Sequence, residues 1–318
     1  LILAQALRVK NYNSVILDFD AERKTLDESV ALIEKTNSKL VVFVLYGQNP
    51  NSGTTMMIGA SELAEELKKN YPSIKIAFIG SHVSALPFEV IKLKYVDFAF
   101  INEGVFSLLA ILKTNLKDHL EKIPGIWFKD EEGNPKKSSV GKIVSTELMD
   151  TIMPGYAWDL LPKNNKTLDK YRAHFWHTNF LNENRTPFAA IYTSLGCQFA
   201  CNFCMINIVN RTSYEENISS VNSKGMRFWS PKLILKEFEK LWEYGVRTLR
   251  ISDEMFFLNR KYYAPILQGL IDRGLKFNLW AYARVDTIRK DQLELFKKAG
   301  VNWLALGIES GNQSVRIE

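Results

Sequence analysis

Three predicted helices in the second half of the chain each end at a glycine and lead directly into an apolar strand. The helices cover residues 231–244, 260–273 and 290–299, and the glycines are Gly245, Gly274 and Gly300. Glycine is favoured after a helix because it adopts the left-handed backbone that other residues avoid. Ser230 and Pro231 give the first helix a capping residue and a favourable first position. With the strands expected at 188–194, 246–252, 275–283 and 301–308, the repeat predicts four βα units and a parallel sheet.

The first 115 residues alternate helices and strands in a similar way. Helices are expected at 1–10, 25–35, 54–70 and 87–93, and strands at 14–18, 40–46, 74–79 and 96–101. Thr25 and Glu28 form a capping box for the second helix. The pattern predicts a doubly wound, Rossmann-like α/β domain whose ligands lie beyond the carboxyl ends of its strands. Because such a domain normally opens on a strand, the helix at the start predicts that at least one strand upstream is missing.

Residues 116–187 break this alternation. Residues 126–128 and 141–144 flank the polar run D-E-E-G-N-P-K-K and are expected to form a hairpin. An aromatic segment follows, which contains Tyr171, Arg172, His174, Trp176 and His177. It is too apolar for a flexible tether, so it is expected to pack between domains, although contact with a substrate is also open. The predicted domains are therefore 1–115, a hairpin and linker at 116–187, and 188–318.

Composition limits the class of protein and its surroundings. Of the 318 residues, 46% are hydrophobic, which supports well-packed cores. No apolar run approaches the roughly 20 residues that span a bilayer, and no leader sequence precedes the first domain, so a cytoplasmic location without a membrane span is expected. The 41 basic and 35 acidic residues give a net charge of +6. The basic residues are scattered, which disfavours nucleic acid and leaves an acidic substrate or a reductase partner open.

All three cysteines of the chain lie in one short segment after the strand expected at 188–194. They are Cys197, Cys201 and Cys204, in the stretch S-L-G-C-Q-F-A-C-N-F-C. Thiolates with the spacing C-x3-C-x2-C can bind three irons of a cubane iron–sulfur cluster, whereas zinc normally takes a fourth Cys or His nearby. The fourth iron would be open to a substrate or cofactor. The alternative is that three buried cysteines fall close together without binding a metal.

This segment resembles the cluster loop of the radical S-adenosylmethionine (radical SAM) enzymes. An aromatic residue, Phe203, precedes the last cysteine as it does in that family, although Gln198 stands where the family usually has proline. The resemblance implies a 4Fe-4S cluster whose open iron is chelated by the methionine part of SAM, and places Phe203 near the adenine. It also implies a partial (βα)6 barrel, of which this chain supplies four strands and lacks the last two.

Polar residues follow the later strands, where a barrel carries its functional groups. The segments I-S-D-E-M-F, A-Y-A-R-V-D and G-I-E-S-G-N resemble SAM-binding segments of the cobalamin-binding radical SAM enzymes. The SAM contacts implied are Asp253, Glu254, Arg284, Glu309 and Ser310. S-D-E replaces the family's usual G-G-E, which leaves the contact to the methionine amine open. Asp286 is either functional or part of a salt bridge across the barrel mouth.

Small and polar residues follow the strands of the first domain. These loops resemble those of the cobalamin-binding domain that precedes some radical SAM barrels, and the implied contacts are Ser52, Gly53, Thr54, Gly80, Ser81, His82, Glu103 and Gly104. No G-x-G-x-x-G dinucleotide fingerprint is present. The motif D-x-H-x-x-G, which supplies a cobalt ligand in other cobalamin domains, is absent too. His82 is therefore expected to be a hydrogen-bonding residue, with cobalt ligation as the alternative.

The resemblance implies a cobalamin-dependent radical SAM enzyme. The expected reaction is methyl transfer from methylcobalamin to an unactivated carbon of a small-molecule or lipid substrate, after a 5′-deoxyadenosyl radical removes hydrogen. A flavodoxin, a ferredoxin or a similar protein is the expected electron donor. A cobalamin-binding enzyme that catalyses cyclisation or rearrangement is the first alternative, and a non-catalytic cobalamin or iron–sulfur sensor is the second. The arrangement also predicts that the three cysteines face the loops at Ser52, Gly80 and Glu103.

Overall fold

The computed structural model describes residues 1–46, 50–164, 166–174, 185–199, 201, 204, 206 and 225–317. The chain divides into two compact units. We call residues 6–148 and 198–225 the five-strand unit, and residues 1–5, 149–197 and 226–318 the four-strand unit, after the main sheet in each. None of the helices in the described residues combines the length and apolar character needed to cross a membrane.

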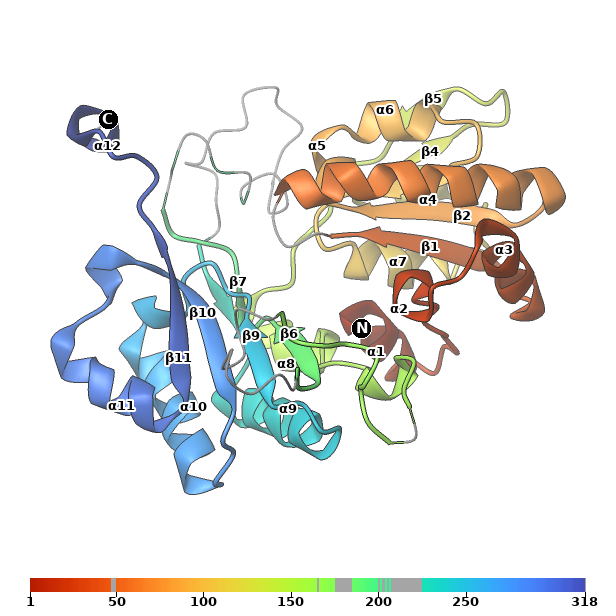
Figure 1. The fold of residues 1–318 in the computed structure, drawn as a ribbon. Coiled ribbons are helices and arrows are strands. Elements are labelled where there is room, and N and C mark those ends of the chain that lie inside the picture. The colour runs from red at the N-terminus through yellow and green to blue at the C-terminus, as the bar shows by residue number, and fades with distance from the viewer. Residues whose placement is uncertain are drawn as a thin grey trace. The chain divides into compact units, whose positions relative to one another are not determined.

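The five-strand unit contains a mixed sheet with the strand order β1-β2-β3-β4-β5 (Figure 1). Its parallel strands are β1 (Leu40–Leu45), β2 (Lys75–Gly80) and β3 (Phe98–Phe100), and its antiparallel strands are β4 (Ile126–Lys129) and β5 (Pro135–Lys137). The middle strands β2 and β3 are almost fully buried, as expected for apolar parallel strands covered on both faces. The predicted α/β fold class is confirmed.

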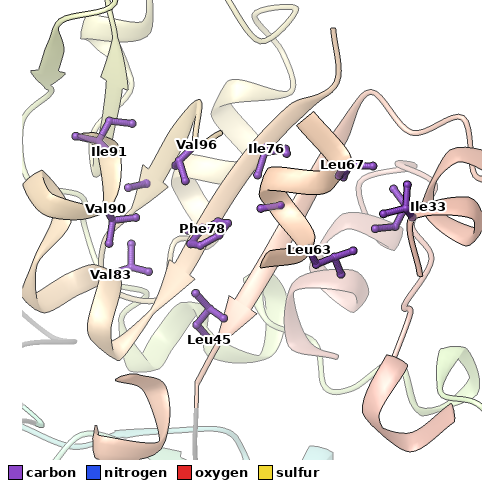
Figure 2. Close-up of a cluster of buried hydrophobic side chains, with 13 residues drawn as sticks. Ile33, Leu45, Leu63, Leu67, Ile76, Phe78, Val83, Val90, Ile91 and Val96 are labelled. Atoms are coloured by element: carbon purple, nitrogen blue, oxygen red, sulfur yellow. The ribbon is translucent and has the colours of Figure 1, made fainter. Parts of the chain in front are cut away.

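Helices on both faces of this sheet create its core. The helices of this unit are α2 (Phe19–Glu22), α3 (Leu26–Lys35), α4 (Pro50–Asn70), α5 (Ser81–Ala85), α6 (Pro87–Lys92), α7 (Val105–Ile111) and the 3-10 turn Leu120–Lys122, while α1 (Ile2–Arg8) is divided between the two units. Figure 1 shows α4 and α6 on one face and α7 on the other. Leu63 and Leu67 of α4, Phe78 of β2 and Val90 of α6 meet in one buried cluster (Figure 2). The predicted capping box of α3 is present, because Thr25 and Glu28 bond reciprocally.

Two predicted strands of this unit are wrong. Residues 14–18 form no strand, and Val15 is 60% exposed although the run is apolar. The second hairpin strand lies at Pro135–Lys137 rather than at 141–144. The turn closes early because the Asp130 carboxylate accepts hydrogen bonds from the backbone of Glu132 and Asn134. Proline is tolerated in β5 because this is an edge strand.

The four-strand unit contains a parallel sheet with the order β11-β10-β9-β6. Its strands are β6 (Phe188–Ile191), β9 (Thr248–Ile251), β10 (Asn278–Arg284) and β11 (Val301–Gly307), and a separate ribbon pairs β7 (Ser194–Leu195) with β8 (Arg227–Phe228). The strand predicted at 188–194 is therefore interrupted. The reason is that the Tyr192 N–H bonds the Tyr156 hydroxyl at 3.0 Å and the Thr193 N–H bonds Asp253 at 2.6 Å, so neither continues the ladder of β6.

The predicted helix–glycine–strand repeat is confirmed. The helices of this part are α8 (Thr146–Ile152), α9 (Pro231–Glu243), α10 (Arg260–Asp272), α11 (Leu293–Lys298), α12 (Gln313–Ile317) and the 3-10 turns Trp158–Leu160, Phe256–Leu258, Val285–Thr287 and Lys290–Gln292. Ser230 caps α9 as expected. Gly245, Gly274 and Gly300 all have positive φ. At Gly300 an added Cβ would also lie 2.2 Å from the Phe277 carbonyl oxygen, so this turn excludes any side chain.

Candidate active site

The loops after β1, β2 and β3 meet at the carboxyl edge of the five-strand sheet. Hydrogen bonds join them: Thr54 Oγ1 lies 3.0 Å from His82 Nδ1, the Asn102 N–H donates to Ser84 Oγ at 2.9 Å, and the Tyr46 hydroxyl donates to the Asn102 carbonyl oxygen. Most of the residues predicted to contact cobalamin therefore lie in one linked group of loops. The sequence analysis missed Tyr46, Ser84 and Asn102, although all three follow directly from the rule that ligands bind beyond strand ends.

Two glycines of these loops allow the close approach of backbone segments. A Cβ added at Gly53 would lie 2.3 Å from Ser81 Oγ, and one at Gly80 would lie 2.3 Å from the Leu45 carbonyl oxygen. Ser81 Oγ is buried and has no hydrogen-bond partner among the residues that the structure describes. A buried hydroxyl without a partner costs about 1 to 3 kcal/mol, so this atom fits a site that a ligand completes. The Ser52 side chain lies outside the described part of the structure.

The loop after β3 is held by backbone geometry. Gly104 has a φ of 62°, and an added Cβ would lie 2.4 Å from the Ile79 Cδ1 atom. Glu103 accepts a hydrogen bond from the Val144 N–H, which fixes its carboxylate within its own unit. Burial lowers the pKa of His82, which keeps the ring neutral near pH 7. A neutral ring bonded to Thr54 fits the expected role of His82 as a hydrogen-bonding residue.

Asp253 follows β9 in the four-strand unit and is completely buried. Its carboxylate accepts hydrogen bonds from the Thr193 N–H at 2.6 Å, from the Thr193 hydroxyl at 2.6 Å and from the Ser194 hydroxyl at 2.5 Å. The Tyr262 hydroxyl donates to the Thr193 carbonyl oxygen on the other side of the segment. Burial raises the pKa of Asp253 to about 6, against the opposing effect of these donors. Asp253 therefore fixes the two residues that lead into the cysteine segment, rather than offering its oxygens to a ligand.

Glu254, the next residue, is also buried, but its carboxylate is bonded less completely than that of Asp253. Burial raises its pKa to about 8, and its Oε2 atom is buried with no hydrogen-bond partner among the described residues. A carboxyl group with an unused oxygen at the carboxyl end of a strand can accept a hydrogen bond from an ammonium or a ribose hydroxyl. Of Asp253 and Glu254, two of the carboxylates predicted to contact SAM, the geometry favours Glu254 as the one available to a ligand.

The other predicted SAM residues lie at the ends of β10 and β11. Arg284 and Asp286 form a bidentate ion pair with distances of 3.0 and 2.8 Å, which lowers the pKa of Asp286. Asp286 is thus in a local ion pair with a residue two positions away in the chain, rather than in one across the barrel mouth. Glu309 has a φ of 63° and follows β11 in an exposed turn, in which the Ser310 N–H donates to the Ile308 carbonyl oxygen at 2.8 Å.

The three cysteines form no disulfide bond, and their exposure increases along the motif: Cys197 is buried, Cys201 is half-buried and Cys204 is exposed. Cys197 is the last residue of its segment of the four-strand unit, whereas Cys201 and Cys204 belong to the five-strand unit. There the Cys204 N–H donates to the Cys201 carbonyl oxygen at 3.1 Å. Within the described ranges no three Cys, His, Asp or Glu side chains are grouped as metal ligands. Phe203 lies outside the described residues.

The aromatic segment before β6 is described only in part. Arg172 pairs with Asp169 at 3.0 Å and donates to the Arg185 carbonyl oxygen at 2.8 Å, and the Phe188 N–H donates to the Tyr171 carbonyl oxygen at 2.9 Å. These contacts join the segment to the start of β6. Trp176 and His177 lie outside the described residues.

Comparison with known proteins identifies the class to which these features belong. Residues 191–317 match the family model of the Radical SAM superfamily. The matched range contains the cysteine motif, the Asp253–Glu254 pair and all the parallel strands after β6. The chain carries a radical SAM domain, and the resemblance noted in the sequence is confirmed.

Curated relatives extend the similarity along the chain. An uncharacterized methyltransferase of Pyrococcus horikoshii is 25% identical over 316 residues, which is 98% of this chain and 60% of the relative. An anaerobic magnesium-protoporphyrin IX monomethyl ester cyclase of Synechocystis is 22% identical over 93% of this chain and 53% of its own length. The chain thus spans little more than half the length of these relatives.

Solved structures show the same fold. The radical SAM methyltransferase TsrM from Kitasatospora setae, solved with cobalamin and a [4Fe-4S] cluster, matches with a TM-score of 0.71 at 15% identity, over 96% of this chain and 57% of that one. The cobalamin-dependent SAM radical enzyme OxsB, solved with aqua-cobalamin and SAM, matches with a TM-score of 0.66 at 16% identity, over 99% of this chain and 42% of that one. The two units therefore have the fold of cobalamin-dependent radical SAM enzymes.

Proposed function

We propose that the protein is a cobalamin-dependent radical SAM enzyme that transfers a methyl group from methylcobalamin to an unactivated carbon. The observation that carries this proposal is the position of all three cysteines after the first strand of a radical SAM domain. In addition, 98% of this chain matches the fold of 56% of TsrM. The curated relative named as a methyltransferase supports the same chemistry.

The residues present fit the cofactors of this reaction. Cys197, Cys201 and Cys204 are the ligands expected for a 4Fe-4S cluster, since three thiolates leave one iron open. Glu254 Oε2 and Ser81 Oγ have no hydrogen-bond partner within the described ranges; the first fits a polar group of SAM, and the second fits a cobalamin group at the edge of the five-strand sheet. When bound, these cofactors supply the electron, the radical and the methyl group.

The protein side chains then have positioning roles. Asp253 fixes Thr193 and Ser194, and so sets where the cysteine segment begins. Gly53 and Gly80 let the strand-end loops pack closely, and the Thr54–His82 bond joins two of them. We further propose a small-molecule or lipid substrate, a flavodoxin or ferredoxin as electron donor, and a cytoplasmic location, since such clusters persist in reducing compartments.

A non-methylating reaction is the second candidate. Two curated relatives named as anaerobic magnesium-protoporphyrin IX monomethyl ester cyclases favour it, one of them from Cereibacter sphaeroides at 30% identity over 37% of this chain. Cyclisation would use the same cysteines and the same cofactors without consuming the methyl group.

The test uses the full-length protein, reconstituted anaerobically with iron, sulfide and cobalamin and supplied with dithionite, methyl-labelled SAM and a small-molecule extract. We expect 5′-deoxyadenosine together with label in a new product, and neither from the Cys201→Ser variant. Formation of 5′-deoxyadenosine with label only in SAM or methionine would favour cyclisation. Absence of 5′-deoxyadenosine from protein with a complete cluster would favour a sensor.

A further inference from the structure

Tyr156 lies in the segment predicted as a linker, and nothing in the sequence pointed to a function for it. The residue is almost completely buried in the four-strand unit. Its hydroxyl accepts a hydrogen bond from the Tyr192 N–H at 3.0 Å and donates one to the Tyr192 carbonyl oxygen at 2.7 Å. In an antiparallel ladder, a residue exchanges both of its backbone groups with one partner residue in the same way. The Tyr156 hydroxyl thus takes the place of a partner strand where β6 ends.

Two buried tryptophans hold the ring of Tyr156. The ring stacks on Trp158, with centroids 4.8 Å apart and an interplanar angle of 18°, and lies tilted against Trp229 at 6.2 Å. Trp158 is fixed because its Nε1 atom donates to Glu237 at 2.8 Å. Trp229 is fixed because its Nε1 atom donates to the Met153 carbonyl oxygen at 2.6 Å. Since burial also raises the pKa of Tyr156 well above its ordinary value, the hydroxyl has a fixed position and keeps its proton.

The bonds to Tyr192 decide where the chain goes after β6. The residues that follow leave the main sheet, because β7 pairs with β8 rather than with β9. Gly196 then adopts a φ of 88°, and Cys197 comes next as a buried residue. A strand that continued past Ile191 would instead keep these residues beside the end of β9. The position of Cys197 therefore depends on the break at Tyr192.

We propose that Tyr156 is a positioning residue for the cysteine motif, because its hydroxyl ends β6 and so determines where Cys197 lies. It acts through the backbone of Tyr192, while Asp253 holds the next residue, Thr193. The two side chains come from different parts of the chain and bond consecutive residues of the same break. The proposal rests on the proposed function only where it takes Cys197 as a cluster ligand.

Tyr156→Phe isolates the role of the hydroxyl. The substitution keeps the ring and its packing on the tryptophans, but both backbone groups of Tyr192 lose this partner. Because buried backbone groups without a partner are costly, the segment that leads to Cys197 should open more often. Urea unfolding checks that the variant remains folded.

The first arm of the test uses the full-length protein without a cluster, so it stands if the proposed function fails. Wild type and Tyr156→Phe are treated with iodoacetamide under native conditions, and labelling of each cysteine is followed by tandem mass spectrometry. We expect the buried Cys197 to react about tenfold faster in the variant, since its protection depends on local opening. The exposed Cys204 should react at the wild-type rate.

The second arm follows the cluster in the reconstituted protein. Tyr156→Phe should still take up iron, but a chelator should remove this iron about tenfold faster than from wild type. The electron paramagnetic resonance spectrum of the dithionite-reduced cluster should also change, because the geometry at the Cys197 thiolate is altered. If wild type assembles no cluster, the proposed function fails, and the labelling of Cys197 alone decides about Tyr156.

Thr248→Val is the matched control for both arms. Thr248 is also buried, and its hydroxyl bonds the Thr186 hydroxyl at 2.8 Å beside the first residue of β6. The variant thus loses a buried hydroxyl bond of the same sheet, at the end away from the cysteines. It should keep the wild-type labelling rate and the wild-type spectrum. The proposal is overturned if Cys197 of Tyr156→Phe reacts at the wild-type rate, or if Thr248→Val accelerates its labelling equally.

Discussion

Asp253 and Glu254 are neighbours in the chain, yet their carboxylates have different partners. Asp253 accepts hydrogen bonds from Thr193 and Ser194, whereas one oxygen of Glu254 is buried without a donor in the part of the chain that the structure describes. Burial raises the pKa of both groups, but only Glu254 lacks donors that would offset much of that cost. At the scale of the residue, the Asp253 carboxylate therefore stabilises the segment before the cysteines, whereas the buried Glu254 carboxylate carries a desolvation cost that hydrogen bonds offset only in part.

Glu254→Gln should stabilise the ligand-free protein at high pH. The folded-state pKa of Glu254 is about 8, above its ordinary value of 4.5, so the folded state binds more protons than the unfolded state between these values. Stability should then fall as pH rises from about 4.5 to 8, and the glutamine variant should not show this loss. We expect the variant to gain roughly 2 to 4 kcal/mol at pH 8.5 and almost nothing at pH 4. Urea unfolding at both pH values measures this, and an equal effect at both would contradict it.

Asp253→Ala should be strongly destabilising and should impair cluster assembly. The substitution leaves three buried donors of Thr193 and Ser194 without an acceptor, at a cost of about 3 to 5 kcal/mol. Asp253→Asn keeps the shape and one acceptor oxygen, so it should recover part of this loss. Thermal unfolding and bound iron per chain after reconstitution are the measurements. Normal iron content in Asp253→Ala would exclude the positioning role.

The turns that lead from helix to strand in the four-strand unit require the glycines that end its helices. Gly274 and Gly300 both have positive φ, but an added Cβ meets nothing within 4 Å at Gly274 and meets the Phe277 carbonyl oxygen at Gly300. The first turn needs only the left-handed backbone. The second also needs the absence of a side chain, because β10 begins directly against it.

This difference predicts unequal costs for the same substitution. Gly274→Ala should destabilise by about 1 to 2 kcal/mol, the cost of a left-handed alanine. Gly300→Ala should cost distinctly more, about 3 kcal/mol or above, because the carbonyl must also move. Urea unfolding of both variants tests this. Equal decreases in the free energy of unfolding would mean that the Phe277 carbonyl moves away from the added methyl group at little cost.

The interrupted strand after β6 is the element where sequence reasoning fell short. The apolar run up to Ser194 predicts one continuous strand, but Tyr156 and Asp253 take the backbone N–H groups of residues 192 and 193. Asp253 is 60 residues from Thr193 in the chain, so no local pattern contains this contact. The failed strand at 14–18 has a similar basis, because an apolar run becomes a strand only where a partner strand is available.

In the whole molecule, the candidate cofactor sites are divided between two units. The loops predicted to bind cobalamin belong to the five-strand unit, whereas Asp253 and Glu254, which were predicted to contact SAM, belong to the four-strand unit. Each group has its own hydrogen bonds and its own sheet. The two sites should therefore fail independently when residues of one of them are changed.

Replacing all three cysteines by alanine tests whether cobalamin binding depends on the cluster ligands, of which Cys197 belongs to the four-strand unit and Cys201 and Cys204 to the five-strand unit. We expect the triple variant at Cys197, Cys201 and Cys204 to lose the broad visible absorption of an iron–sulfur cluster after reconstitution, because no thiolate remains to bind iron. The variant should still bind cobalamin with a Kd within about twofold of the wild-type value. A twofold change in Kd corresponds to about 0.4 kcal/mol, which is the usual size of the effect of a substitution outside a binding site. Equilibrium dialysis with cobalamin measures the second effect. Loss of cobalamin binding together with the cluster would show that the sites are coupled.

The sequence by itself determined the local order of this protein. Helix caps at Thr25 and Ser230, the glycine stops and the cysteine spacing act within a few residues, and the structure has the caps and the glycine stops where they were expected. Only the tertiary structure decided which polar groups are already bonded and which remain open. Asp253 and Glu254 are adjacent in the chain, and local sequence cannot distinguish their environments. Their environments differ because burial and hydrogen bonding are set by segments distant in the chain, such as Thr193 and Ser194.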